Sequence, residues 1–347
     1  ARFFFAAWIT FIVGTLMLIL RGVGVLPTNI ITQHSIEFGI ILEMILLTFA
    51  LSDKIRVLMN ERQKDISLQL HESEKIGQMS SLFKQFVPQE VLNHLPHSDI
   101  SSIKLGESVQ KKMTVLIVDI RNFSTFSESH SPKDVFKFMN DYFAHVEPHI
   151  TEYNGFVDKY MGDSVIALFD NPNDALLSSV AIIKAVEAFN TKTDHAIHVG
   201  IGIHSGNCIL GTIGSKNRMD STLISDTIEQ TFEIEQVTKE FQSKIILTYK
   251  TMDLLKNKDI YKFRFIDRFY FGDSYTKLYE LILVDSPQLI QEKSDSQAVF
   301  EQAVILYHNK EYLKAFELFE ECKEIAPNDP AILTYINRCH HHFETIE

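Results

Sequence analysis

The sequence predicts an α+β domain with the ferredoxin-like order of elements, preceded by apolar helices and a charged helix and followed by an α-helical segment. Two apolar stretches of membrane-spanning length lie within residues 1–53. Strand and helix patterns follow one another in the order β-α-β-β-α-β within residues 106–290. Residues 291–347 contain the spacing of a helix-turn-helix repeat. These regions, with a linker at residues 54–105, are the expected domains.

The N-terminal region contains two candidate transmembrane helices. Residues 3–20 form an uncharged run of 18 residues, which is close to the minimum length of a helix that crosses a bilayer. A secretory signal peptide is the alternative, but the basic flank is thin and no small-residue cleavage site follows. The second stretch, residues 36–55, contains Glu43, which we expect to face other helices rather than lipid.

The charges that flank these stretches predict an orientation. The connecting loop contains only Arg21, whereas four basic residues follow the second stretch: Lys54, Arg56, Arg62 and Lys64. By the positive-inside rule, the chain after residue 53, including its C-terminus, lies in the cytosol. Because two spans start directly at residue 1, we expect them to end a larger, multi-pass sensor module of the inner or cytoplasmic membrane.

Charge and cysteine content exclude other classes. The net charge of −12 lies after residue 52, in a part with 31 basic and 43 acidic residues. No nucleic-acid partner is expected, because phosphate backbones favour clustered Lys and Arg. The three cysteines form no CxxC pair, so neither a disulfide framework nor a zinc cage is expected. The run CHHH at 339–342 could bind a metal, but adjacent residues on a helix point in different directions.

Residues 54–105 form a charged linker with apolar residues at fragmentary heptad spacing: Ile55, Met59, Ile66 and Leu70. A parallel coiled coil that carries signals from the membrane is one interpretation. A single solvated helix is the other, because the region of Arg62 and Asp65 interrupts the apolar seam. The pattern leaves both open.

The globular region has a regular succession of elements. A buried strand is predicted at 113–120, a helix at 131–154, a hairpin at 155–169 and a second helix at 175–190. The glycine-punctuated segment 198–214 predicts two further strands. This order predicts a ferredoxin-like sheet with its helices on one face.

Two aspartates end up at one edge of that sheet. Asp119 ends the first strand and is followed by IRNFSTFSE, where amides that open a helix could hold phosphate oxygens. Asp163 lies in the turn of the hairpin. Because the two strands concerned are central and neighbouring, we expect the carboxylates to converge. Two carboxylates beside helix-opening amides predict a site for two Mg²⁺ ions and a triphosphate.

Over residues 106–285 the chain resembles the class III adenylate and guanylate cyclases. The motifs that match, in order, are TVLIVDIRNFSTFSE, GFVDKYMGDSVIALF, GIHSGNCILGTIGS and RMDSTLISDT. The apolar spans resemble the end of the seven-helix membrane module of bacterial receptor-type signalling proteins. The segment with NDPAILTYINRC resembles a helical-repeat extension found after many bacterial cyclase domains.

The resemblance implies a site shared between two catalytic domains. Asp119, Asp163 and the carbonyl of Ile120 would bind two Mg²⁺ or Mn²⁺ ions for an in-line displacement that releases pyrophosphate. Lys159 and Thr222 would contact the base in the partner's site. A lysine and a hydroxyl suit the N1 acceptor and N6 donor of adenine, so ATP is favoured over GTP. A dimer is implied, which the candidate coiled coil would help to hold.

One motif departs from the family pattern. Active homodimeric cyclases have an asparagine and, four residues later, an arginine, which point together at the ribose and at the phosphate charge of the transition state. Here Glu229 and Glu233 occupy these positions, and Ser225 replaces the glycine before them. Losing such an arginine lowers the rate on the order of 10³- to 10⁵-fold. Structurally, Asp226 and Glu229 resemble a capping box, and Glu233 a solvated helix residue.

Three functions remain open. The chain could supply the metal-binding aspartates to a heterodimer whose other chain supplies asparagine and arginine. It could be a weak homodimeric adenylate cyclase. It could also be a non-catalytic module that binds nucleotide or dimerises and passes on a membrane signal. A membrane-anchored cyclase homologue with low activity of its own is favoured.

The C-terminal region contains the positions of a 34-residue helical repeat: Tyr312, Ala315, Phe319 and Pro327. One repeat and a partial helix at 331–343 cannot bury a long solenoid core. We therefore expect this TPR-like segment either to dock on the globular domain or to pair between protomers.

Overall fold

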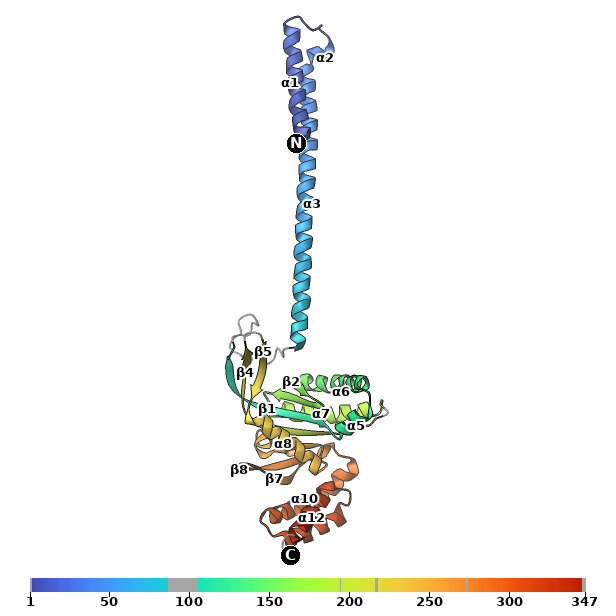
Figure 1. The fold of residues 1–347 in the computed structure, drawn as a ribbon, viewed down its shortest axis with the longest axis vertical. Coiled ribbons are helices and arrows are strands. Elements are labelled where there is room, and N and C mark those ends of the chain that lie inside the picture. The colour runs from blue at the N-terminus through green and yellow to red at the C-terminus, as the bar shows by residue number, and fades with distance from the viewer. Residues whose placement is uncertain (1, 87–104, 194, 216–217, 273, 345–347) are drawn as a thin grey trace. The chain divides into compact units, whose positions relative to one another are not determined.

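The computed structural model of the protein describes residues 2–86, 105–193, 195–215, 218–272 and 274–344. The chain forms two compact units, Ala1–Gln85 and Phe86–Glu347. Figure 1 shows the helices and strands of each.

The N-terminal unit consists of three helices, α1 (Arg2–Gly22), α2 (Ile30–Gln33) and α3 (Ser35–Phe86). By length and composition, α1 and the first part of α3 could each cross a membrane, with mean hydropathies of 2.4 and 1.8. A Cβ atom on Gly14 would lie 2.7 Å from the carbonyl oxygen of Ser35. Glycine at this position therefore lets α1 and α3 pack closely.

Helix α3 continues without a break from the second apolar stretch into the charged linker. The apolar residues of the linker, including Ile55, Met59 and Leu70, are exposed in the single chain. The linker is thus helical at least to Phe86, whereas its pairing in a coiled coil stays a prediction. The remainder of the predicted linker, residues 87–104, lies outside the described residues.

The second unit is built on one sheet of order β2-β3-β1-β4-β6-β8-β7. Strand β1 (Ser108–Ile120) lies between β3 (Ser164–Phe169) and β4 (Val199–Ser215) and is antiparallel to both, and β2 (Phe156–Met161) pairs with β3. These four strands have the predicted ferredoxin-like order. The other strands are β5 (Arg218–Ile224), which pairs with β4, β6 (Ile245–Thr248), β7 (Phe263–Phe271) and β8 (Ser274–Leu281).

The two helices of the predicted β-α-β-β-α-β order lie on one face of the sheet, as expected, and a later helix covers the other face. Helices α6 (Pro132–Glu152) and α7 (Pro172–Asn190) pack on the face that contains Leu116 and Val118 of β1. Helix α8 (Asp226–Glu240) contacts the opposite face, next to Val115 and Ile117. Short helices complete the domain: α5 (Phe123–Ser129), α9 (Tyr249–Asp253), η2 (Lys258–Ile260) and η3 (Ile282–Val284).

The glycine-rich segment forms one strand, β4, rather than the two strands predicted. Three of its glycines, Gly200, Gly202 and Gly206, face α8 and permit close packing. A Cβ atom on Gly202 would lie 2.7 Å from the amide nitrogen of Glu235, and one on Gly206 would lie 2.1 Å from Oγ1 of Thr227. The sequence pattern suggested breaks in the strand because a glycine can either interrupt a strand or allow another element to pack closely against it.

The C-terminal segment is a set of three helices, α10 (Pro287–His308), α11 (Tyr312–Ile325) and α12 (Pro330–Glu344). They share a hydrophobic cluster with α8, β7 and β8, in which Phe300, Phe319 and Tyr335 are fully buried. The segment therefore docks on the globular domain, one of the two arrangements expected. Its membership of the TPR family stays a prediction.

Candidate active site

Asp119 lies at the end of β1 and is 7% exposed. Both of its carboxylate oxygens have partners. The Oγ hydroxyl of Ser164 donates to Oδ1, and the Nζ ammonium of Lys239, in the last turn of α8, lies 2.5 Å from Oδ2. Because β1 and β3 are neighbours and α8 covers their face, three separate elements meet at this carboxylate.

Asp163 lies in the turn between β2 and β3, directly after Gly162, whose φ of +60° is readily adopted by glycine. Burial and the nearby charge of Asp119 raise the pKa of Asp163 to about 6, although its carboxylate also accepts hydrogen bonds from its own amide and from that of Ile120. The predicted convergence of Asp119 and Asp163 is therefore present in the fold, and the amide of Ile120 lies beside them.

Three further charged residues of this site were missed by reasoning from the sequence. Glu235 is fully buried, and burial together with the charge of Asp119 raises its pKa to about 7. Lys239 lies one helical turn later and 3.6 Å from the Glu235 carboxylate. Arg121 donates to the carbonyl oxygens of Thr238 and Ser243. The i, i+4 spacing of Glu235 and Lys239 was visible, but their position beside Asp119 depends on how α8 packs.

The donor set fits divalent metal ions of the kind that prefer oxygen. Among the described residues, Asp163 has no cation bonded to its carboxylate. Burial, and after it the charge of Asp119, raises the pKa of this carboxyl group. The described residues contain no group of three or more His, Cys, Asp and Glu that could hold a metal alone. Mg²⁺ characteristically binds one or two carboxylates and completes its shell with water and substrate phosphates.

The two candidate base-contacting residues lie elsewhere on the sheet. Lys159 is on β2, with its Nζ 3.3 Å from Oδ2 of Asp158. Thr222 of β5 pairs with Gly211 of β4, whereas Asp119 pairs with Gly200. These β4 positions are eleven residues apart, which corresponds to about 36 Å along an extended strand. One chain therefore does not bring Thr222 to its own Asp119.

Glu229 and Glu233 are exposed on one side of α8. The predicted capping box of Asp226 and Glu229 was wrong. Ser225 is the N-cap: its backbone is extended and its Oγ accepts a hydrogen bond from the amide of Thr227. Asp226 is thus the first helical residue, and Glu229 lies one position too far along the helix for a box.

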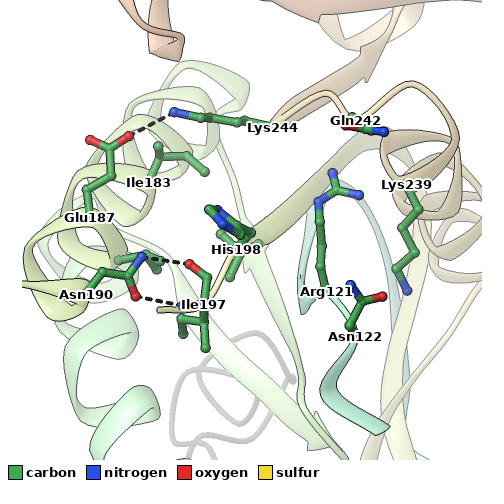
Figure 2. A pocket seen from close by; sticks show the side chains of 12 residues that line it. Arg121, Asn122, Ile183, Glu187, Asn190, Ile197, His198, Lys239, Gln242 and Lys244 are labelled. Carbon is green, nitrogen blue, oxygen red and sulfur yellow. Dashed lines mark hydrogen bonds and ion pairs between the residues drawn. The ribbon is translucent and has the colours of Figure 1, made fainter. Parts of the chain in front are cut away.

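A cavity of about 670 Å³ is lined in part by Lys239, the partner of Asp119, and by Arg121 (Figure 2). It is bordered by the end of β1, the end of α7, the start of β4 and the end of α8, and Arg121, His198, Lys239 and Lys244 supply its basic side chains. Lys244 is held by Glu187 at 2.8 Å. Lys239 therefore borders both this cavity and Asp119.

Residues 107–273 match the family model described as the adenylate and guanylate cyclase catalytic domain. Residues 1–54 match the model described as 7TM diverse intracellular signalling. Both matches agree with the family resemblances that the motifs indicated.

Two curated relatives and one solved structure illustrate the similarity. The terminal-differentiation-specific adenylate cyclase of Dictyostelium discoideum is 30% identical over 79% of this chain and 13% of its own length. An adenylate cyclase of Anabaena cylindrica is 34% identical over 56% of this chain and 41% of its own length. The chain thus spans less than half of each. A bacterial light-regulated adenylyl cyclase structure has a TM-score of 0.54 at 21% identity, covering 62% of this chain and 63% of that one, which supports the fold alone.

Proposed function

Residues 107–273 belong to the class III adenylate and guanylate cyclase family, and on that premise we propose that the protein is a membrane-anchored nucleotide cyclase homologue. Its nominal reaction is the conversion of ATP to cyclic AMP and pyrophosphate. The observation that carries the proposal is the convergence of Asp119, Ile120 and Asp163, which combines two acidic side chains with an excess of negative charge.

In this proposal, Asp119, Asp163 and the carbonyl of Ile120 hold two Mg²⁺ or Mn²⁺ ions per site. Such ions, when bound, neutralise the triphosphate and favour ionisation of the attacking 3′-hydroxyl. Asp119 and Asp163 would hold the ions from the same edge of the sheet. Ser164 supports this arrangement because its hydroxyl fixes one oxygen of Asp119.

Lys159 and Thr222 bind the adenine base of a nucleotide whose phosphates lie in the site of a second chain. The strand register supports this division, because Thr222 and Asp119 of one chain lie at opposite ends of β4. The functional unit is therefore a dimer, either of this chain or with another cyclase domain.

Activity of the chain on its own is low. Glu229 and Glu233 present carboxylates on an exposed side of α8 where the family has an amide and a cation. Carboxylates repel the phosphate charge that the transition state concentrates, and loss of the cation alone lowers the rate on the order of 10³- to 10⁵-fold. A partner that supplies asparagine and arginine would restore the complete site.

The second candidate is a non-catalytic module that binds nucleotide or dimerises and transmits a signal. Two observations favour it: the glutamate pair on α8, and the uninterrupted α3, which joins an apolar span to the linker. In either case we propose a multi-pass protein whose regions 54–105, 106–290 and 291–347 lie in the cytosol.

Binding of nucleotide tests the site assignment. The full chain in detergent should bind ATP in the presence of Mn²⁺ or Mg²⁺, as measured by equilibrium dialysis. Asp119→Ala and Asp163→Ala should each abolish the metal-dependent part. Unchanged binding in both variants would refute the assignment.

Catalysis separates the two candidate functions. Cyclic AMP formation is measured for the full chain and for the double variant Glu229→Asn, Glu233→Arg. A strong increase in the variant indicates an otherwise intact cyclase site. ATP binding without any recovery of activity indicates the signalling module.

A further inference from the structure

The closest cation to the candidate metal site belongs to the protein itself. The ammonium of Lys239 lies 2.5 Å from Oδ2 of Asp119 and 3.6 Å from Oε2 of Glu235. We propose that Lys239 is an internal counter-cation that holds Asp119 in the metal-free protein, and that a divalent ion binds only by displacing it. The inference rests on the proposed function, since it takes Asp119 as a metal ligand.

Competition follows from the geometry of the carboxylate. The hydroxyl of Ser164 donates to Oδ1 of Asp119, and the ammonium of Lys239 donates to Oδ2. Both carboxylate oxygens therefore already accept a hydrogen bond. A bound Mg²⁺ lies about 2.1 Å from its oxygen ligand. An ammonium 2.5 Å from that same oxygen would lie within a few ångströms of the ion, where two positive charges repel strongly. Lys239 and the metal ion therefore exclude each other.

A second acceptor is available for the displaced lysine. Glu235 precedes Lys239 by one helical turn on the same helix, and its buried carboxylate is already within 3.6 Å. The Lys239 side chain is 37% exposed and borders the cavity of about 670 Å³ shown in Figure 2. Rotation of this one side chain is enough to move its charge from Asp119 towards Glu235.

The helix that carries Lys239 is held in place from its other side. Arg338 of α12 donates to the carboxylate of Glu240, the next residue of α8, at 2.7 and 2.9 Å. Thr334 donates to the carbonyl oxygen of Glu240. Because the backbone at Lys239 is anchored, the exchange is a movement of the side chain and not of α8. Lys239 thus sets a threshold of metal concentration, below which it stays bound to Asp119 and no divalent ion binds.

Metal affinity without nucleotide tests the proposal. Mn²⁺ binding to the full chain is measured by electron paramagnetic resonance for the wild type, Lys239→Gln and Lys244→Gln. Lys244 is the matched control, since it borders the same cavity but is paired with Glu187. Removing a partly buried ionic hydrogen bond from Asp119 should tighten Mn²⁺ binding about five- to tenfold in Lys239→Gln, with no change in Lys244→Gln.

The outcomes distinguish this proposal from the proposed function. If Asp119→Asn abolishes Mn²⁺ binding but Lys239→Gln binds no more tightly than wild type, the counter-cation proposal is overturned and the metal site stands. If Asp119→Asn binds Mn²⁺ as well as wild type does, the metal site itself is refuted.

A measurement on the wild type covers the case in which Lys239→Gln does not fold. Saturating Mn²⁺ should increase the acylation rate of Lys239 by a lysine-selective reagent, followed by mass spectrometry, while that of Lys244 stays constant. An acylation rate of Lys239 that does not respond to Mn²⁺ would contradict displacement.

Discussion

Two clusters of charge in the second unit have the same composition but opposite electrostatic character. The site cluster consists of Arg121, Asp119, Asp163, Glu235 and Lys239. The anchor cluster consists of Arg264, Glu280, Asp285, Lys293 and Asp329, and it joins β7 and β8 to the C-terminal helices. Each contains three carboxylates and two cations, so the number of charges does not explain how they differ.

In the anchor cluster, the cations bond directly to carboxylates. Arg264 is fully buried and contacts both Glu280 and Asp329, while Lys293 contacts Glu280 and Asp285 at 2.7 Å. Burial acts to raise the pKa of Glu280, but Lys293 and Arg264 outweigh it and lower the pKa to about 2. Every carboxylate of the anchor cluster therefore has a cationic partner within the cluster.

In the site cluster, one cation is used elsewhere. Arg121 donates to backbone carbonyls, so that among the described residues only Lys239 contacts carboxylates of this cluster. The pKa of Asp163 is raised to about 6 and that of Glu235 to about 7, in both cases mainly by burial. The two clusters therefore differ in how their charges are paired. A cluster in which every carboxylate is bonded to a cation stabilises an interface, whereas a cluster with an unpaired carboxylate attracts an external cation.

The largest expected effect comes from removing a cation of the anchor cluster. Arg264→Met leaves Glu280 and Asp329 buried without their shared partner. Breaking one side of a buried ion pair costs about 3–5 kcal/mol in the free energy of unfolding. Urea denaturation measures this loss, and Lys314→Met, at a fully exposed pair, serves as the control with no measurable change. A loss no greater than that of the control would show that the cluster contributes nothing.

The second-largest expected effect is the loss of stability of the anchor cluster at low pH. Since the pKa of Glu280 falls from about 4.5 to about 2 on folding, its contribution is complete above pH 4.5 and is lost as the pH falls towards 2. A shift of this size corresponds to about 3 kcal/mol. Asp285 acts in the opposite direction, because burial raises its pKa. Glu280→Gln should therefore flatten the dependence of unfolding free energy on pH between 4.5 and 2, and an unchanged slope would contradict the assignment.

The site cluster should show the reverse sign. Above pH 6 the ionised Asp163 destabilises the folded state, because its pKa is raised from 3.8 to about 6. Asp163→Asn should raise the unfolding free energy at pH 7 by about 1 kcal/mol, after allowance for its half-exposed position, while it abolishes metal binding. The gain should disappear as the pH falls below 3.8, where Asp163 becomes protonated in both states. Thermal melts at pH 7 and at a pH below 3.8 measure this change in stability. If Asp163→Asn destabilised the protein at pH 7, the ionised Asp163 would not be destabilising the folded state.

Sequence reasoning reached one part of the site cluster and missed the other for a physical reason. Asp119 and Asp163 belong to a strand end and a hairpin turn, whose relative position follows from local pattern and strand order. Glu235 and Lys239 reach the same place only because Gly202 lets α8 lie against β4. The sequence pattern predicted two glycine-punctuated strands in segment 198–214, since the packing role of a glycine depends on a helix distant in sequence. The anchor cluster also depends on packing between residues distant in the chain, and no pattern in the sequence indicates it.

The smallest expected effect lies at the contact between α8 and α12. Glu240→Gln weakens the contact with Arg338, which keeps its bond to Asp267 at 3.0 Å. A half-exposed ion pair contributes about 0.2–1 kcal/mol, so urea denaturation should show a loss within that range. Mn²⁺ affinity should stay at the wild-type value, because the glycine face of β4 still positions Lys239. A change in Mn²⁺ affinity would instead show that the C-terminal helices control the metal site.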